Sequence, residues 1–513
     1  MPTYLSPGVY VEEVEAGSRP IEGVGTAVAA FVGLASAGPF NAPTLVTNWS
    51  QFTQNFGDFM DGSYLAHSVY GYFLNGGGAC YVVRVGANGA ASPAARAELT
   101  SAAGGDAAPS VGAFRVQALA EGAVGNDVSV EIADSGTEGA TEDAFKVVVK
   151  KGGKVEETFD NVTTKKGRQN VATVVNAQSK LIRVEDLGVA AEKVSRGTVA
   201  LSGGGASAPA RLGPDDYVGD SADRTGFGGL EAVDEITMVC VPDLMAAYQS
   251  RMIDMEGVQA VQLAMIAHCE LMGDRVAVLD PPPGLNAQQI KEWRVDKAGY
   301  DSKYAALYWP WVKIFDPSSG TNKHVPPSGH MAGIWSRNDD TRGVHKAPAN
   351  EVVRGAISLE VNITKSEHDL LNPVGVNCIR AFPGRGIRVW GARTLSSDAA
   401  WRYLNVRRLF NYLEESILNG TDWVVFEPND PALWSKIRRT ISAFLVNEWR
   451  KGALFGLTPG EAFYVKCDAE TNPAEGIDAG QVLCEIGVAP VKPAEFVIFR
   501  LSQFSGGASL VNE

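Results

Sequence analysis

The alternation of strand-like and helix-like segments between residues 236 and 316 constrains the fold more than any other feature. Apolar runs of strand length cover 236–241, 275–279 and 305–315, and helical periodicity covers 258–272 and 286–297. The first helical segment places one apolar face at i, i+3 and i+7 spacing: Val258, Val261, Met265, Cys269 and Met272. A β-α-β-α-β order predicts a parallel sheet with right-handed crossovers. We therefore expect an α/β domain in this part of the chain.

A β-rich stretch interrupts this domain. Apolar strands are predicted at 27–34 and 80–85, with a helix at 63–74 between them. Residues 87–212 then alternate with period two between turns, and breaks rich in small residues flank them on both sides. We assign 21–86 and 213–365 to an α/β outer domain, and 87–212 to a β-rich surface insertion.

Residues 366–500 contain two strong helices between strands, which predicts a separate C-terminal α+β domain. We expect the first helix to begin at Ser397 or Asp398 and to stop at Gly420. The second begins with Asp430-Pro431, an N-cap followed by proline at the first helical position, and ends at Gly452. Its apolar stripe comprises Trp434, Ile437, Ile441, Phe444 and Leu445.

The opposite face of the second helix is basic. It carries Lys436, Arg439, Arg450 and Lys451. Residues 434–451 hold five cations, Arg438 included, against Glu448, so the segment is +4 in a chain of net charge −14. A solvated helix face explains this pattern as well as an electrostatic dock for an acidic partner does. The acidic chain as a whole is unsuited to nucleic-acid binding over its surface.

Both ends of the chain contain strand-like segments that cannot fold alone. Residues 1–20 place Pro and Gly around Tyr10, Val11, Glu12, Glu13 and Val14, and the tail 501–513 holds Ser509, Leu510, Val511 and Asn512. An extended leader of this kind spans roughly 50 Å at ~3.3 Å per residue, enough to reach a neighbouring molecule. The alternative interpretation is a frayed terminus.

The sequence indicates synthesis in the cytoplasm. The start lacks the pattern of a secretion signal, and the longest apolar stretch near it, 24–35, is shorter than the ~18 residues of a membrane span. The six cysteines are scattered without a CxxC pair, which favours reduced thiols. We therefore expect no direct insertion into a membrane.

A second hypothesis is a doubly wound α/β enzyme. Asp243, Asp280 and Asp316 follow three predicted strands, where ligands bind in such sheets, and three carboxylates could hold Mg²⁺. Aspartates that cap turns explain the same positions. His324, His330 and His345 share a loop-rich stretch, but their spacing fits no metal site, so structural roles are favoured. Phosphate-binding and hydrolase motifs are missing, and we expect no cofactor.

Three segments resemble the family of contractile tail sheath proteins of phages and phage-like injection particles. They are VPPSGHMAGIWSRNDDTRGVHKAPAN at 325–350, NPVGVNCIRAFPGRGIRVWGARTL at 372–395 and YLSPGVYVEE at 4–13. The first segment is similar to a loop typical of that family. His330 and His345 depart from the family pattern, where apolar or aromatic residues are expected. The resemblance covers both ends and the middle of the chain, leaving out the insertion.

The resemblance implies a structural subunit rather than an enzyme. Subunits of this kind polymerise helically around an inner tube in a metastable extended state, then contract to drive the tube through a target envelope. The resemblance implies that the terminal arms add strands to neighbouring copies and that the basic helix faces the tube. It also implies contacts with baseplate and terminal cap proteins. The assembled particle would be a phage tail or a released or membrane-docked injection particle.

Overall fold

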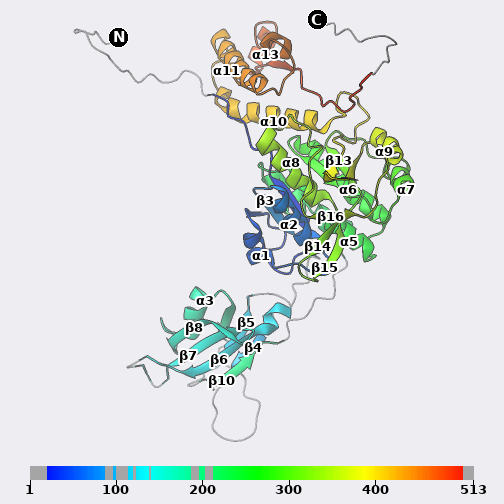
Figure 1. Cartoon of the computed structure of the whole chain (residues 1–513). Helices are drawn as coiled ribbons and strands as arrows, with labels where there is room; N and C mark the ends of the chain where they lie inside the picture. Colours follow the sequence, from blue (N-terminus) through cyan, green and yellow to red (C-terminus); the bar gives the residue numbers. More distant parts are fainter. Residues whose placement is uncertain are drawn as a thin grey trace, which may run out of the picture.

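The computed structural model of the chain describes residues 20–86, 212–500 and most of 114–202, with the backbone of 96–99. Residues 1–19, 87–95, 100–113, 203–211 and 501–513 lie outside this description, as do short gaps at 120–122, 138–139, 142, 187–193 and 195. The predicted arm strands at 10–14 and 509–512 therefore lie outside the described residues. Figure 1 shows three bodies along one axis, with the α/β domain in the middle.

An eight-stranded sheet forms the core of the middle body, in the order β18-β17-β13-β12-β11-β1-β3-β2. Its parallel strands are β1 (Ala29–Gly33), β3 (Cys80–Arg84), β11 (Met238–Cys240), β12 (Val276–Leu279), β13 (Ala305–Trp309) and β17 (Val376–Phe382). The edge strands β2 (Thr44–Val46) and β18 (Gly386–Val389) are antiparallel to their neighbours. Every residue of β1, β11, β12 and β13 is buried, as expected of parallel strands covered on both faces. The predicted parallel sheet is confirmed.

Helices cover both faces of this sheet. They are α1 (Trp49–Phe56), α2 (Leu65–Asn75), α4 (Pro214–Val218), α5 (Asp243–Gln249), α6 (Met255–Met272), α7 (Ala287–Glu292), α8 (Ser328–Arg342) and α9 (Lys365–Leu371). The apolar face predicted for the helix at 258–272 is buried in α6, except that Met272 is half-buried at the C-terminus. Helix α7 continues as a π-helical turn over Trp293–Ala298, so the second predicted helix is also confirmed.

The predicted strand at 305–315 is wrong, because the structure divides it into two strands. β13 ends at Trp309, and β14 (Val312–Asp316) begins a separate antiparallel sheet with β15 (Thr321–Val325) and β16 (Ala356–Leu359). Pro310 lies between them and has no N–H with which to continue a central ladder. Asp316 is therefore not at the edge of the parallel sheet.

The expected start of the C-terminal region at residue 366 is too early, because β17 and β18 complete the central sheet. The first helix beyond the sheet is α10 (Leu404–Thr421), with Tyr403 at its N-cap rather than Ser397 or Asp398. The Asp398 carboxylate instead accepts a hydrogen bond from the Ala400 N–H at 2.8 Å and closes a turn. Asx turns of this kind are the alternative use of a capping residue.

The segment 325–350, expected as a loop, contains the buried helix α8, which packs closely on α2. Added Cβ atoms at Gly329 and Gly333 would lie 2.4 Å from the Ser68 carbonyl oxygen and 2.3 Å from the Tyr72 carbonyl oxygen. Only glycine allows the two backbones to approach this closely. The two glycines are therefore part of the contact surface of a helix pair.

The C-terminal body is built on α10 and α11 (Pro431–Arg450). Asp430 caps α11 through its carboxylate, which accepts from the Leu433 N–H at 2.7 Å, as the Asp-Pro pair predicts. All five residues of the predicted apolar stripe are buried. β19 (Phe463–Lys466) pairs only with β20 (Glu485–Val488), and α12 (Pro459–Ala462) and α13 (Ala474–Asp478) complete this body.

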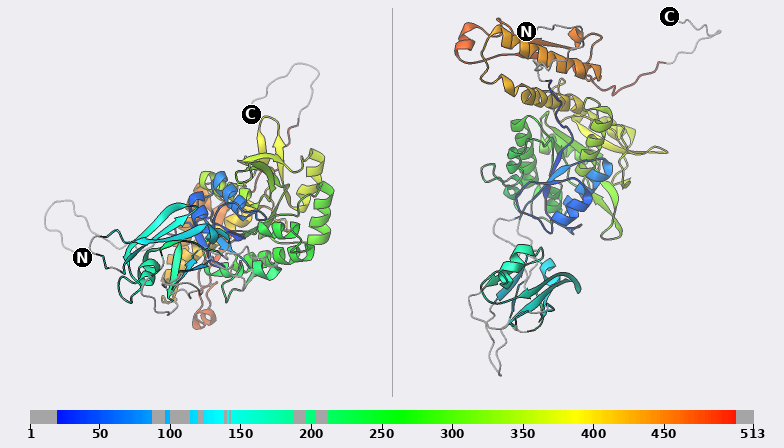
Figure 2. Two further views of the ribbon diagram at one scale, coloured as in Figure 1. Left: turned by 90° about the horizontal axis from the view of Figure 1, so that it is seen from below. Right: turned by 90° about the vertical axis from the view of Figure 1, so that its left-hand side faces the viewer.

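The insertion forms its own β-rich body, as the sequence predicts. β5 (Phe114–Ala118) pairs with β4 (Arg96–Leu99) and β9 (Ile182–Asp186); β6 (Val128–Asp134), β7 (Phe145–Lys151), β8 (Lys154–Val162) and β10 (Gly197–Ala200) form a second sheet. Helix α3 (Val171–Gln178) packs against β9 and β8. An apolar cluster separate from the central core includes Val130, Phe145 and Val175. Figure 2 shows this body from two further directions. Across the described residues, no helix is long and apolar enough to cross a membrane.

Candidate assembly surfaces

The segment that precedes β1 connects the central sheet to the C-terminal body. Ile21 is buried against Gly420 of α10, and the Val24 N–H donates to Ser416 Oγ at 3.1 Å. The segment then enters β1 in the middle of the sheet. Figure 1 shows this dark blue stretch running from the sheet along α10. The described part of the chain therefore begins beside the C-terminal body.

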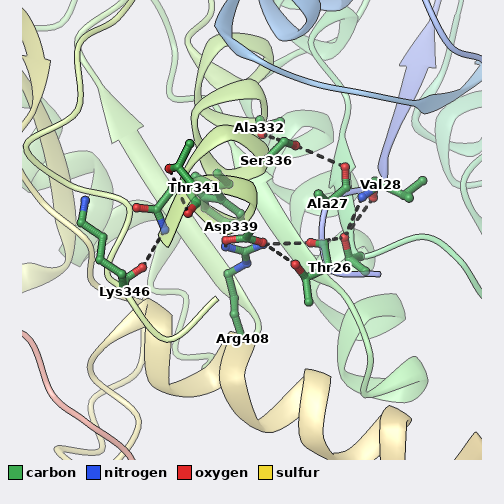
Figure 3. Close-up of polar contacts among 12 residues, drawn as sticks. Thr26, Ala27, Val28, Ala332, Ser336, Asp339, Thr341, Lys346 and Arg408 are labelled. Carbon is green, nitrogen blue, oxygen red and sulfur yellow. Dashed lines mark hydrogen bonds and ion pairs between the residues drawn. The ribbon is translucent and has the colours of Figure 1, made fainter. Parts of the chain in front are cut away.

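A buried ion pair fixes this crossing point (Figure 3). Arg408 of α10 donates to both carboxylate oxygens of Asp339 on α8, at 2.9 and 2.6 Å, and to the Thr26 carbonyl oxygen at 2.9 Å. The Thr26 hydroxyl completes the group by donating to Asp339 at 2.6 Å. The guanidinium also lies over the Trp335 ring, 4.8 Å from its centroid. Three distant segments of the chain are thereby joined through one charged pair.

The C-terminal segment is anchored in a similar way. After β20, Glu495 pairs with Arg393 at 2.6 and 2.9 Å and accepts from the Asn372 amide at 2.7 Å. Burial opposes ionisation of Glu495, but hydrogen bonds from Arg393 and Asn372 outweigh it and hold its pKa below the ordinary value. The carboxylate is thus ionised at neutral pH and ties the segment to the central body.

Directly after this anchor, four large apolar side chains are exposed. Phe496, Val497, Ile498 and Phe499 are 73%, 67%, 80% and 85% exposed, in a segment that belongs to no sheet of the described chain. A run of this kind is costly to leave in water and is typical of a segment that packs on another chain. The exposure of this run was not predicted, although the apolar residues are visible in the sequence.

The β19–β20 sheet has only two strands. Beside it, Tyr464, Phe455 and Leu457 are 60%, 73% and 90% exposed. Two-stranded sheets are marginally stable in water, and their outer edges carry backbone groups free to pair with further strands. The sheet is therefore a candidate acceptor for strands from another molecule.

The predicted basic face of α11 is divided by the structure. Arg439 and Arg450 are exposed and form no hydrogen bond or ion pair within the described part of the chain. Lys436 is half-buried over the Trp423 ring, 4.2 Å from its centroid. Lys451 is exposed but pairs with the buried Glu448 at 2.7 Å. The arginines are thus the members most available to a partner.

The three aspartates of the enzyme hypothesis do not form one site. Asp243 is buried and accepts hydrogen bonds from Leu34 N–H at 2.6 Å, Ser63 Oγ at 2.9 Å, Leu65 N–H at 3.1 Å and Tyr64 N–H. Burial raises its pKa to about 6, although these bonds oppose the shift. Its oxygens are occupied in joining the loops after β1 and before α2.

Asp280 and Asp316 also have structural roles. The Asp280 carboxylate accepts from Ser328 N–H at 2.9 Å and Ser328 Oγ at 2.5 Å, at the start of α8, and burial raises its pKa to about 7. Asp316 accepts from Ser318 and Ser319 in the turn after β14. Asp316 therefore caps the turn that follows it, as the structural alternative predicts, whereas Asp243 and Asp280 bind loops and a helix start that are distant in the sequence. The enzyme hypothesis loses its proposed site.

The three histidines are also separate from one another. His330 is buried on α8, His324 lies on β15, and His345 is half-buried beyond α8. Within the described residues, no group of three or more His, Cys, Asp or Glu side chains could hold a metal ion. The structural interpretation is the one that fits these positions.

Comparisons with known proteins identify the family. A model described as "Phage tail sheath protein central domain" matches residues 229–395, and one described as "Phage tail sheath C-terminal domain" matches residues 396–504. Together these models match more than half of the chain. The junction between them falls after β18, where the central sheet is complete.

Relatives and solved structures agree with this family. A tail sheath protein of Vibrio phage KVP40 is 27% identical over 69% of this chain, which spans about half (54%) of that relative. A tail sheath protein of Burkholderia phage BcepMu is 23% identical, with 96% of this chain and 95% of the relative covered. The helical sheath of the anti-feeding prophage in its contracted state shares the fold, with TM-score 0.58, 23% identity and 98% and 100% coverage. The chain belongs to the phage tail sheath family.

Proposed function

We propose that this protein is the sheath subunit of a contractile phage tail or tail-like injection particle. Copies polymerise helically around an inner tube in a metastable extended state and contract to drive the tube through a target envelope. The observation that carries this proposal is the two-stranded β19–β20 sheet with its exposed apolar rim. Open, head-to-tail contacts of this kind build helical polymers.

The terminal arms are proposed to link the copies. Residues 10–14 and 509–512 would add strands to the edges of a neighbour's β19–β20 sheet, and the exposed run at 496–499 would pack beside it. Main-chain hydrogen bonds link strands largely independently of side-chain identity. The arms can therefore stay attached while contacts between the larger bodies are exchanged during contraction.

The basic face of α11 is proposed to meet acidic groups on the inner tube, chiefly through Arg439 and Arg450. Exposed ion pairs contribute only ~0–1 kcal/mol each, so they guide assembly and still break when the sheath contracts. The baseplate and a terminal cap are the further partners, and assembly takes place in the cytoplasm of the producing cell. No nucleotide is needed for contraction, because the free energy is stored during assembly.

Edge pairing is tested by proline substitution and by deletion. Ala489 N–H donates to the Ala462 carbonyl, so residues 462 and 489 are a hydrogen-bonded pair. Because hydrogen-bonded and non-hydrogen-bonded pairs alternate along the ladder, the N–H of Val465 points outward, away from β20. Val465→Pro should leave a folded monomer that does not form ordered tubes in negative-stain electron microscopy. Deleting residues 1–14 should have the same effect. Normal tubes from both variants would contradict strand exchange.

The tube contact is tested separately by charge reversal. Arg439→Glu combined with Arg450→Glu should lower the yield of extended sheath on co-expressed tube protein. The matched control reverses Lys166 and Lys297, two exposed lysines on the insertion and after α7, and should assemble normally. Equal yields from the two double variants would remove the case for the basic face.

A further inference from the structure

The β19–β20 hairpin brings two cysteines together. Lys466 is paired with Glu485 at the end of the ladder, so the next residues, Cys467 and Cys484, lie opposite each other. Cys467 is buried and Cys484 partly buried in the same apolar cluster as the inner face of α11. Their side chains therefore point to the same side of the hairpin and contact one another.

The position of this pair in the ladder suits a disulfide. Ala489 N–H donates to the Ala462 carbonyl oxygen, which makes 462 and 489 a hydrogen-bonded pair. The ladder ends one residue earlier, at Lys466 and Glu485. Extended by one residue, its alternation would make Cys467 and Cys484 a non-hydrogen-bonded pair, the kind whose Cα atoms lie ~4.5 Å apart. Disulfides span Cα separations of about 4.4–6.8 Å. The pair can therefore be joined with little backbone movement.

The remaining cysteines are placed differently. Cys80, Cys240, Cys269 and Cys378 lie in the core of the central body on β3, β11, α6 and β17, and all are fully buried. An oxidant dissolved in water cannot reach them in the folded protein. Cys484 alone among the six is partly exposed, which gives small molecules access to one pair of thiols.

We propose that Cys467 and Cys484 are a redox modification site that small disulfides, of the glutathione disulfide class, convert to a cross-strand disulfide. The Cys484 thiolate attacks one sulfur of the small disulfide and releases one equivalent of thiol. The Cys467 thiolate then attacks the mixed disulfide at Cys484 and releases the second equivalent. Two protein thiols are oxidised, one small disulfide is reduced, and the two protons pass to the released thiols.

The surroundings make this exchange slow. Burial raises the pKa of Cys484 to about 12 and also raises the pKa of Cys467. Arg438, which donates to the Cys467 carbonyl oxygen at 2.7 Å, favours the thiolates but does not offset burial. Thiolate is the attacking species, so the rate should rise as pH rises above neutrality. The pair thus stays reduced in a reducing compartment and oxidises gradually outside one.

The disulfide would fix β19 and β20, the two strands that α13 connects in the sequence. Asn472 already ties the ends of this excursion, since its amide donates to the Leu483 carbonyl oxygen at 3.0 Å and accepts from the Leu483 N–H at 2.7 Å. A covalent link beside these bonds would restrain the acceptor sheet further. This consequence rests on the proposed function, whereas formation of the bond does not.

The test is oxidation of the intact, folded chain with glutathione disulfide at pH 7 and pH 8.5. After the reagent is removed, denatured samples should show four reactive thiols instead of six, and digestion without reductant should yield a peptide linking Cys467 to Cys484. The reaction should be faster at pH 8.5. The Cys484→Ser variant should keep all five of its remaining thiols reactive. The matched control, Cys378→Ser, should still form the bond between Cys467 and Cys484.

Two outcomes would overturn the proposal without any variant. One is a wild-type chain whose six thiols all remain alkylatable after prolonged exposure at pH 8.5. The other is a stable glutathione adduct on Cys484 with no link to Cys467, which would show that the two thiols do not meet. Failure of tube formation would bear on the proposed function alone, because this assay reads the bond in unassembled protein.

Discussion

Replacing Arg408 should loosen the attachment of the C-terminal body more than any surface substitution. In Arg408→Ala, the Asp339 carboxylate stays buried with the Thr26 hydroxyl as its remaining donor, and the Thr26 carbonyl loses the guanidinium. The two side chains are only 3% and 4% exposed, so water does not replace the lost partner. Removing one member of a buried ion pair costs about 3–5 kcal/mol.

Hydrogen exchange of α10 is the appropriate assay, because it reports local opening within a chain of several bodies. A loss of about 3 kcal/mol corresponds to roughly a hundredfold faster exchange of amides protected by local opening. Arg408→Lys should be intermediate, since an ammonium cannot make the paired hydrogen bonds. Arg385→Ala, at an exposed hairpin position, is the control.

The combined variant Arg408→Met with Asp339→Leu separates charge from packing. Exchanging a buried pair for apolar side chains leaves no isolated charge, so its cost should be smaller than that of Arg408→Ala alone. If Arg408→Ala exchanged within threefold of wild type, the argument that this pair holds α10 to α8 would be refuted.

Three further outcomes are expected. Gly333→Ala should lower the free energy of unfolding by about 1–3 kcal/mol in urea titrations, because its Cβ would lie 2.3 Å from the Tyr72 carbonyl oxygen; Gly460→Ala, in helix α12 with no atom within 4 Å of the added Cβ, is the control. Burial lowers the pKa of His330 to about 4. Below pH 6.5 this histidine therefore takes up a proton on unfolding, and the free energy of unfolding falls by about 2 kcal/mol from pH 7 to pH 5. In His330→Gln the urea midpoint should fall less between these two pH values, because this contribution is missing. Ile498→Asp should leave the monomer's melting curve unchanged, as the side chain is 80% exposed, while reducing tube yield in electron micrographs.

The central fold could be predicted because its signals are local. Apolar strands, a helical stripe and the Asp430-Pro431 cap each follow from the residues themselves, and the structure has them where expected. Pro310 was equally visible, but its effect depends on which strands neighbour it. The sequence showed a run of apolar residues there and could not show that the run serves two sheets.

Helix α8 shows a second limit. Its glycines and polar residues have low helix propensity, so the local sequence does not indicate a helix. The glycines matter only because α2 packs directly against the backbone of α8. The aspartates show the reverse, because their positions after strands suggested chemistry while their partners, such as Ser328, come from elsewhere in the chain. Partners distant in sequence decide both cases.

The entry of the N-terminal segment into β1 has a mechanical consequence. β1 is an interior strand with parallel neighbours on both sides, so a pull along the segment loads its hydrogen bonds together in shear instead of opening them one after another. The Arg408–Asp339 pair lies on the same line and shares that load before it reaches the sheet. A subunit pulled by its arm would therefore move as one piece, and traction between neighbours would become displacement of whole bodies.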